Sequence, residues 1–106
     1  MTPVRVSRVR FEEAVGIALD SLPDAFQRYV EDIEFVVAET SPDGLLGLYE
    51  GAGALGEGDW PARITIFQRE HEDRCRTWPE LQEEVRRTVL HEIGHHFQME
   101  EHELPW

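Results

Sequence analysis

The chain has 106 residues, a length that corresponds to one domain and leaves no room for a second hydrophobic core. Apolar residues make up 41% and charged residues 30%, which is typical of a soluble globular protein and excludes a disordered or membrane-spanning one. The 22 Asp and Glu outnumber the 10 Lys and Arg, and the net charge of −12 repels nucleic-acid phosphates and anionic lipid surfaces. We therefore expect a single domain over residues 1–106 that binds neither nucleic acid nor membranes.

The N-terminus and the cysteine content bear on the compartment. The first residues contain no hydrophobic segment long enough for a signal peptide or a transmembrane helix. The single cysteine, Cys75, cannot form an internal disulfide, as suits a reducing compartment. These observations predict a cytoplasmic protein whose one thiol lies on a helix surface or is half buried.

The N-terminal segment predicts two helices. From Ser7 to about Leu22, apolar residues recur at intervals of three and four, and Ser7 is a suitable N-cap. Pro23 ends this helix and suits the first turn of a second, shorter one that runs to about Val30. The apolar positions of the first helix are Val9, Phe11, Ala14, Val15, Ile17, Ala18 and Leu19.

Two segments have the β-branched and aromatic composition of strands, residues 33–38 and residues 63–67. The second is short enough to form the edge of a small sheet. Most of the glycines lie between them, over residues 44–58, which predicts either a short strand at 45–50 with a loop or a loop throughout. The order of helices and strands indicates a layered α+β fold.

The last helix has the clearest boundaries. Thr77-Trp78-Pro79-Glu80 has the spacing of a capping box, so we expect a helix from there to about Phe97. One side of this helix is apolar, and His96 lies within that side, where we expect it to pack as a hydrogen-bonded core histidine. The apolar positions are Leu81, Val85, Val89 and Ile93.

Within this helix, His91-Glu92-Ile93-Gly94-His95 has the spacing H-E-x-x-H. At about 100° per residue the two histidines lie one turn apart on the same side, so both imidazoles can reach one ion. Imidazole is a good ligand for zinc, whereas calcium and magnesium sites are built from oxygens. Glu92 projects onto the neighbouring arc, where its carboxylate can accept a proton from water instead of binding the metal.

A catalytic zinc ion normally takes a third protein ligand besides water. If the helix continued, His102 would lie about 10.5 Å along the axis from His95, too far to share the ion. We therefore expect a bend just after Phe97 that brings Glu101 back under the metal; the alternatives are His102 as the third ligand, or no ligand from this segment. The candidates considered are Glu100, Glu101, His102 and Glu103.

The segment HEIGHHF, preceded by RRTVL, resembles the minimal bacterial zincin-like metallopeptidases. The segments FEEAVGIALDSLPDAF, LLGLYEG and PARITIFQR are similar to that family's pattern in the same order. The resemblance implies a zincin-like fold in which a small mixed sheet packs against the helix. It also implies zinc as cofactor, with His91 and His95 as ligands, Glu92 as general base and an acidic third ligand at Glu101. The chain departs from the extended motif at Gln98, where a glycine would suit a bend.

These residues predict a zinc-dependent metallopeptidase that acts on a peptide or protein substrate. Residues 64–67 are a candidate edge strand for pairing with an extended substrate, by analogy with zincins. Tyr49 is a candidate for stabilising a developing oxyanion, the alternative being an aromatic ring that packs the loop onto the core.

Two other functions fit the same sequence. The first is a non-enzymatic, zinc-containing protein-interaction module, because the residues after His102 are few for the lower wall of a peptidase cleft. The second is a metal-free domain in which His91 and His95 are ordinary surface histidines.

Overall fold

The computed structural model describes residues 2–28, 30–51, 62–97, 99 and 101–103, with the backbone alone at position 101. No helix in this part of the chain combines the length and the hydrophobicity that crossing a membrane requires. The elements in chain order are α1 (Arg8–Asp20), α2 (Asp24–Gln27), β1 (Ile33–Ala38), β2 (Gly47–Glu50), β3 (Ala62–Phe67), α3 (Gln68–Glu72), α4 (Trp78–His96) and the 3-10 helix η1 (Glu101–Glu103).

The three strands form one mixed sheet in the order β1-β3-β2. β3 pairs in parallel with β1 and antiparallel with β2. The expectation that residues 63–67 form a sheet edge is therefore wrong. β3 takes the centre because Ile64 and Ile66 are completely buried, whereas β2 has only four residues and suits an edge. The α+β class and the small mixed sheet are as expected from the sequence.

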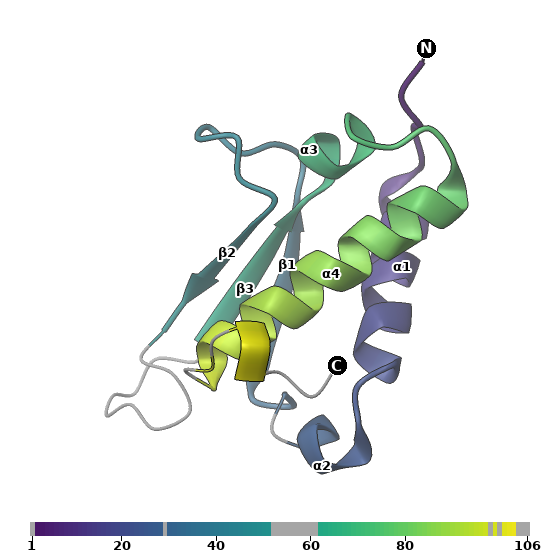
Figure 1. Ribbon diagram of the computed structural model, residues 1–106. Coiled ribbons are helices and arrows are strands. Elements are labelled where there is room, and N and C mark those ends of the chain that lie inside the picture. The colour runs from purple at the N-terminus through teal and green to yellow at the C-terminus, as the bar shows by residue number, and fades with distance from the viewer. Residues whose placement is uncertain (1, 29, 52–61, 98, 100, 104–106) are drawn as a thin grey trace.

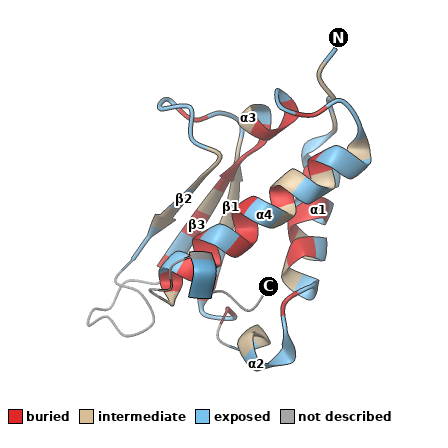
Figure 2. Cartoon of the chain, in the orientation of Figure 1, coloured by how far each residue is buried: buried red, intermediate tan, exposed pale blue. Residues whose placement is uncertain are grey.

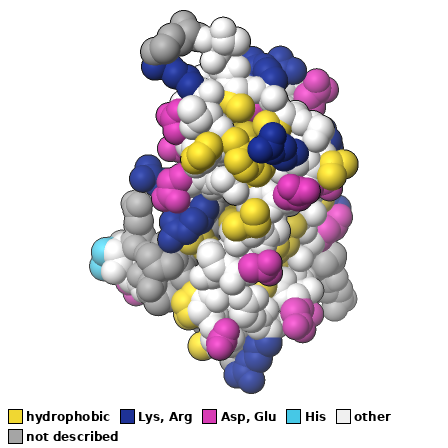
Figure 3. All heavy atoms as spheres, turned by 90° about the vertical axis from the view of Figure 1, so that its right-hand side faces the viewer, with side chains coloured by type: hydrophobic (Ala, Val, Ile, Leu, Met, Phe, Trp, Pro, Cys, Tyr) yellow, Lys and Arg dark blue, Asp and Glu magenta, His cyan; other side chains and the backbone are white. Residues whose placement is uncertain are grey.

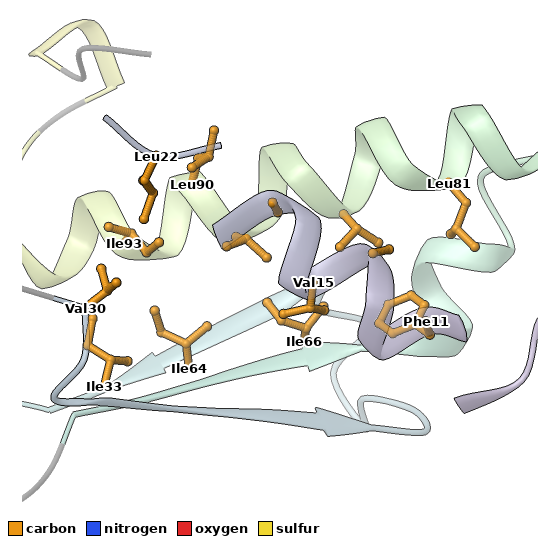
Figure 4. Close-up of a cluster of buried hydrophobic side chains, with 14 of the residues drawn as sticks. Phe11, Val15, Leu22, Val30, Ile33, Ile64, Ile66, Leu81, Leu90 and Ile93 are labelled. Atoms are coloured by element: carbon orange, nitrogen blue, oxygen red, sulfur yellow. The ribbon is translucent and has the colours of Figure 1, made fainter. Parts of the chain in front are cut away.

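Helices α1 and α4 cover one face of the sheet (Figure 1). Figure 4 shows Ile64 and Ile66 of β3 pointing from the sheet toward these helices, with Val15 of α1 beside Ile66. The buried residues of α4 face the sheet across the core, as the apolar spacing of this helix predicted (Figure 2). The core residues of α4 are Leu81, Val85, Val89, Leu90 and Ile93.

Helix α1 begins at the predicted cap, where the Ser7 hydroxyl oxygen accepts a hydrogen bond from the Arg10 backbone N–H at 3.1 Å. Its buried residues are Phe11, Ala14, Val15 and Ala18. Val9 and Ile17 are 69% and 53% exposed, so only some of the apolar residues of this helix belong to the core. Figure 3, which views the molecule from the side of α1, shows hydrophobic side chains lying among charged ones.

Helix α3 follows β3 directly and was not predicted, because the segment that forms it is polar. Three of its polar side chains, those of Gln68, His71 and Glu72, are nevertheless buried, since they have partners inside the protein. The Glu72 carboxylate accepts a hydrogen bond from the Val6 backbone N–H at 2.9 Å, and Gln68 donates one to the Val6 carbonyl at 3.0 Å. Cys75, expected to be at least half exposed, is only 2% exposed, and this burial raises the pKa of its thiol.

Candidate metal centre

Three potential metal-binding side chains lie together near the end of α4. One ligand atom each from His91, Glu92 and His95 lies within 4.8 Å of the others. The ring centroids of His91 and His95 are 4.6 Å apart, as expected for residues one helical turn apart. Both histidines are exposed, whereas Glu92 is one of the buried residues of α4. The helix therefore places two imidazoles at the margin of the core, open to solvent, beside a buried carboxylate.

The Glu92 side chain is only 9% exposed and extends from α4 toward the sheet. Its Oε1 atom lies 3.1 Å from Nδ1 of His95. Its other oxygen, Oε2, points at β2, where it would lie 3.2 Å from a Cβ atom built at Gly47. The two carboxylate oxygens thus have different neighbours, one on the helix and one on the edge strand.

The donor set fits zinc. The two imidazoles of His91 and His95 are ligands that zinc prefers and that calcium and magnesium sites rarely use, and the carboxylate of Glu92 lies beside them as a proton acceptor. Donor atoms that share a zinc ion at about 2.0–2.2 Å stand at most about 4.4 Å apart. A spacing within 4.8 Å therefore comes close to this requirement.

The chain turns away at the end of α4, as the predicted bend requires. The helix ends at His96, and the N–H of Met99 donates to the Gly94 carbonyl at 2.9 Å, a bond typical of a helix terminus where the chain changes direction. The residue Glu101 begins η1, but its side chain lies outside the described residues, as does Gln98. The described side chain of His102 is not part of the three-residue group. The third ligand thus stays a prediction.

Tyr49 and His96 contact each other on the buried side of α4. The Tyr49 hydroxyl lies 3.1 Å from Nδ1 of His96, and their rings pack edge to face with centroids 5.8 Å apart. His96 is 7% exposed, and burial lowers its pKa. The expectation of a hydrogen-bonded packing histidine is confirmed. For Tyr49, the structure favours packing against the core over contact with a substrate.

A second buried hydrogen-bonded pair anchors α4 one turn before Glu92. His71 is completely buried, with Nδ1 2.6 Å from the Phe67 carbonyl and Nε2 2.7 Å from the Thr88 hydroxyl. Because a carbonyl can only accept, Nδ1 carries the hydrogen, and Nε2 accepts the Thr88 hydroxyl proton. A neutral imidazole therefore ties α3 and the end of β3 to the helix that carries the candidate site.

This pair predicts that stability depends on pH. Burial lowers the pKa of His71, and it outweighs the hydrogen bond to the Phe67 carbonyl and the nearby Glu84 carboxylate, which both raise that pKa. In the unfolded chain, His71 has an ordinary pKa of about 6.5, so it takes up a proton at a higher pH than in the folded protein. The free energy of unfolding therefore falls as the pH drops below about 6.5. In His71→Gln this contribution is absent. We expect the stability difference between wild type and variant, measured by urea unfolding at pH 7.5 and pH 5.5, to shrink at the lower pH; a constant difference would contradict this assignment.

Sequence reasoning missed two residues beside the site, Gly47 and His71. A glycine in an alternating strand pattern is a signal for close backbone approach, and Gly47, the first residue of β2, belongs to such a pattern. His71 lies in a polar segment whose pattern gives no sign that the residue is buried, so its contact with Thr88 follows from the fold alone.

The fold and the candidate site together define a small α+β protein with a His-Glu-His group on its last long helix. The chain matches the family of zincin-like metallopeptidases over residues 15–105. Since this match spans most of the chain, the protein belongs to that family. No curated protein matches the chain.

Proposed function

We propose that this protein is a zinc-dependent metallopeptidase in which His91, His95 and Glu101 hold the ion and Glu92 is the general base. The observation that carries the proposal is the group of His91, Glu92 and His95 on one helix, within 4.8 Å of one another, in a chain of the zincin-like family. We propose further that the domain spans residues 1–106 and acts in the cytoplasm, as the sequence predicts.

The exposure of each side chain supports its proposed role. A zinc ion, when bound, polarises a carbonyl and lowers the pKa of water. His91 and His95 are exposed, so their nitrogens are accessible to an ion from solvent. Glu92 is buried and fixed against His95, which suits a carboxylate that takes a proton from water and passes it to the leaving amine. The fixed position of Glu92 supports its assignment as base.

The edge strand β2 is the candidate for holding an extended peptide. In the described sheet, β2 pairs only with β3, so the backbone groups along its other side have no strand partner. A strand of this kind can bind an extended peptide through backbone hydrogen bonds. The sequence suggested residues 64–67 for this role; because β2 is the edge strand, we propose β2 instead, and its Gly47 lies beside the proposed base.

Metal removal tests the proposed function. We expect the zinc-loaded protein to cleave members of a library of random short peptides, detected by mass spectrometry. Treatment with EDTA followed by dialysis should abolish cleavage, and stoichiometric zinc should restore it. A protein that binds zinc at one equivalent but cleaves no peptide in the library would contradict peptidase activity and favour the non-enzymatic interaction module.

A further inference from the structure

Strand β2 crosses α4 at Gly47 with no space for a side chain. A Cβ atom built at this position would lie 2.8 Å from Cγ2 of Thr88 and 3.1 Å from Cγ of Glu92. It would also lie 3.2 Å from Oε2 of the same carboxylate. Carbon atoms at van der Waals contact are about 3.5–4.0 Å apart, so any side chain here would displace the helix residues or the strand.

The backbone conformation does not explain this glycine. Among the described glycines, Gly44 and Gly51 have positive φ angles, of 71° and 150°, and Gly47 does not. Gly47 lies in regular strand and pairs with Ile66 of β3. An alanine could adopt the same backbone angles, so the requirement at this position is for space next to Glu92.

The carboxylate of Glu92 is therefore confined from two directions. Nδ1 of His95 lies 3.1 Å from Oε1, and Oε2 borders Gly47, where a Cβ atom would lie 3.2 Å from it. Thr88, one turn earlier on α4, borders the same space at Gly47 and is itself hydrogen-bonded to the buried His71. The contact between strand and helix thus fixes where the carboxylate lies relative to β2.

We propose that Gly47 is a positioning residue, whose missing side chain sets the location of the Glu92 carboxylate against the edge strand. This inference rests on the proposed function, since a position matters for catalysis only if Glu92 acts as the base. A general base must lie within hydrogen-bonding distance of the water it deprotonates, and a misplacement of about 1 Å can cost about 100-fold in rate.

The first variant to test is Gly47→Ala. We expect kcat for peptide hydrolysis to fall by about 10- to 100-fold, with a smaller change in KM, because the base is displaced. Zinc affinity should stay within about twofold, since the three atoms nearest the new methyl group belong to Thr88 and Glu92. Gly16→Ala is the matched control: a Cβ atom there meets nothing within 4 Å, so kcat should be unchanged.

A second variant separates positioning from a loss of folding stability. Thr88→Ser removes the methyl group at 2.8 Å but keeps the hydroxyl that bonds His71. The double variant Gly47→Ala with Thr88→Ser should therefore recover most of the stability lost in Gly47→Ala. The contacts to Glu92 remain, so its kcat should stay at least about 10-fold below that of Thr88→Ser alone. Recovery of kcat together with stability would overturn the proposal and leave Gly47 a purely structural residue.

A binding measurement keeps this test independent of peptide cleavage. Acetohydroxamic acid would bind zinc as its anion, and a carboxylate beside the ion would favour binding by taking up the proton that is otherwise released to solvent. We expect calorimetry on the zinc-loaded proteins to give at least about 10-fold weaker binding for the double variant than for Thr88→Ser, and a similar loss for Glu92→Gln. Equal affinity in the double variant and Thr88→Ser would overturn the role of Gly47. Failure of the wild type to bind zinc would contradict the proposed function itself.

Discussion

Replacing Glu92 by glutamine is expected to lower kcat for peptide hydrolysis by about 10²–10⁴-fold while zinc remains bound. The amide has nearly the same shape as the carboxylate and fits the space between His95 and Gly47, but it cannot accept a proton. The measurement combines kcat on a cleaved peptide with the zinc content of the same sample.

The matched control for this variant is Glu83→Gln, which makes the same chemical change on the same helix. Glu83 is 50% exposed and forms ion pairs only with neighbouring arginines among the contacts described, and such surface pairs contribute little. We expect its kcat and zinc content to match those of the wild type. Unchanged hydrolysis in Glu92→Gln would contradict the assignment of this residue as the base.

Replacing His91 by alanine is expected to weaken zinc binding by more than about 100-fold, because one of the proposed ligands is lost. The His91 side chain is exposed, so the fold should tolerate the change. Chelator competition measures the affinity, and Arg87→Ala, at a 67% exposed position one turn earlier on α4, is the control that should bind zinc normally. Equal zinc affinity in His91→Ala and wild type would leave the metal-free domain as the better interpretation.

The same measurement identifies the third ligand. We expect Glu101→Ala to weaken zinc binding by about 10-fold or more and His102→Ala to leave it nearly unchanged. The reverse order would assign the third position to His102. Normal binding in both variants would show that the ion takes its third ligand elsewhere or has none from this segment.

The parts of the fold that follow from local patterns could be predicted. Strand β1 has the bounds that its β-branched and aromatic residues indicate, and α4 begins directly after its predicted N-cap, Thr77, whose side chain accepts from the Glu80 N–H. The helical period also placed His91 and His95 together on the exposed margin of α4. Each of these features depends on residues close together in the chain.

The features that were missed depend on contacts between distant segments. Residues 63–67 looked like an edge because the strand is short, yet β3 became central when β1 and β2 paired with it from both sides. Val9 and Ile17 share the apolar pattern of α1, but α4 and the sheet cover only part of the apolar side of this helix. These two residues are therefore exposed. The importance of Gly47 depends on its position beside the Glu92 carboxylate, which lies on α4, far along the chain.

The location of the His-Glu-His group at the end of α4 has a consequence for metal affinity. Aligned peptide dipoles leave about half a negative elementary charge at the C-terminal end of a helix; His95 lies in the last turn of α4 and His91 one turn before it. A divalent cation at this end is stabilised by that charge, and an ion shared by two residues one turn apart stabilises the turn in return. Helix formation and ion binding are therefore thermodynamically linked, so that substitutions which fray the last turns of α4 will weaken the metal site without altering a ligand.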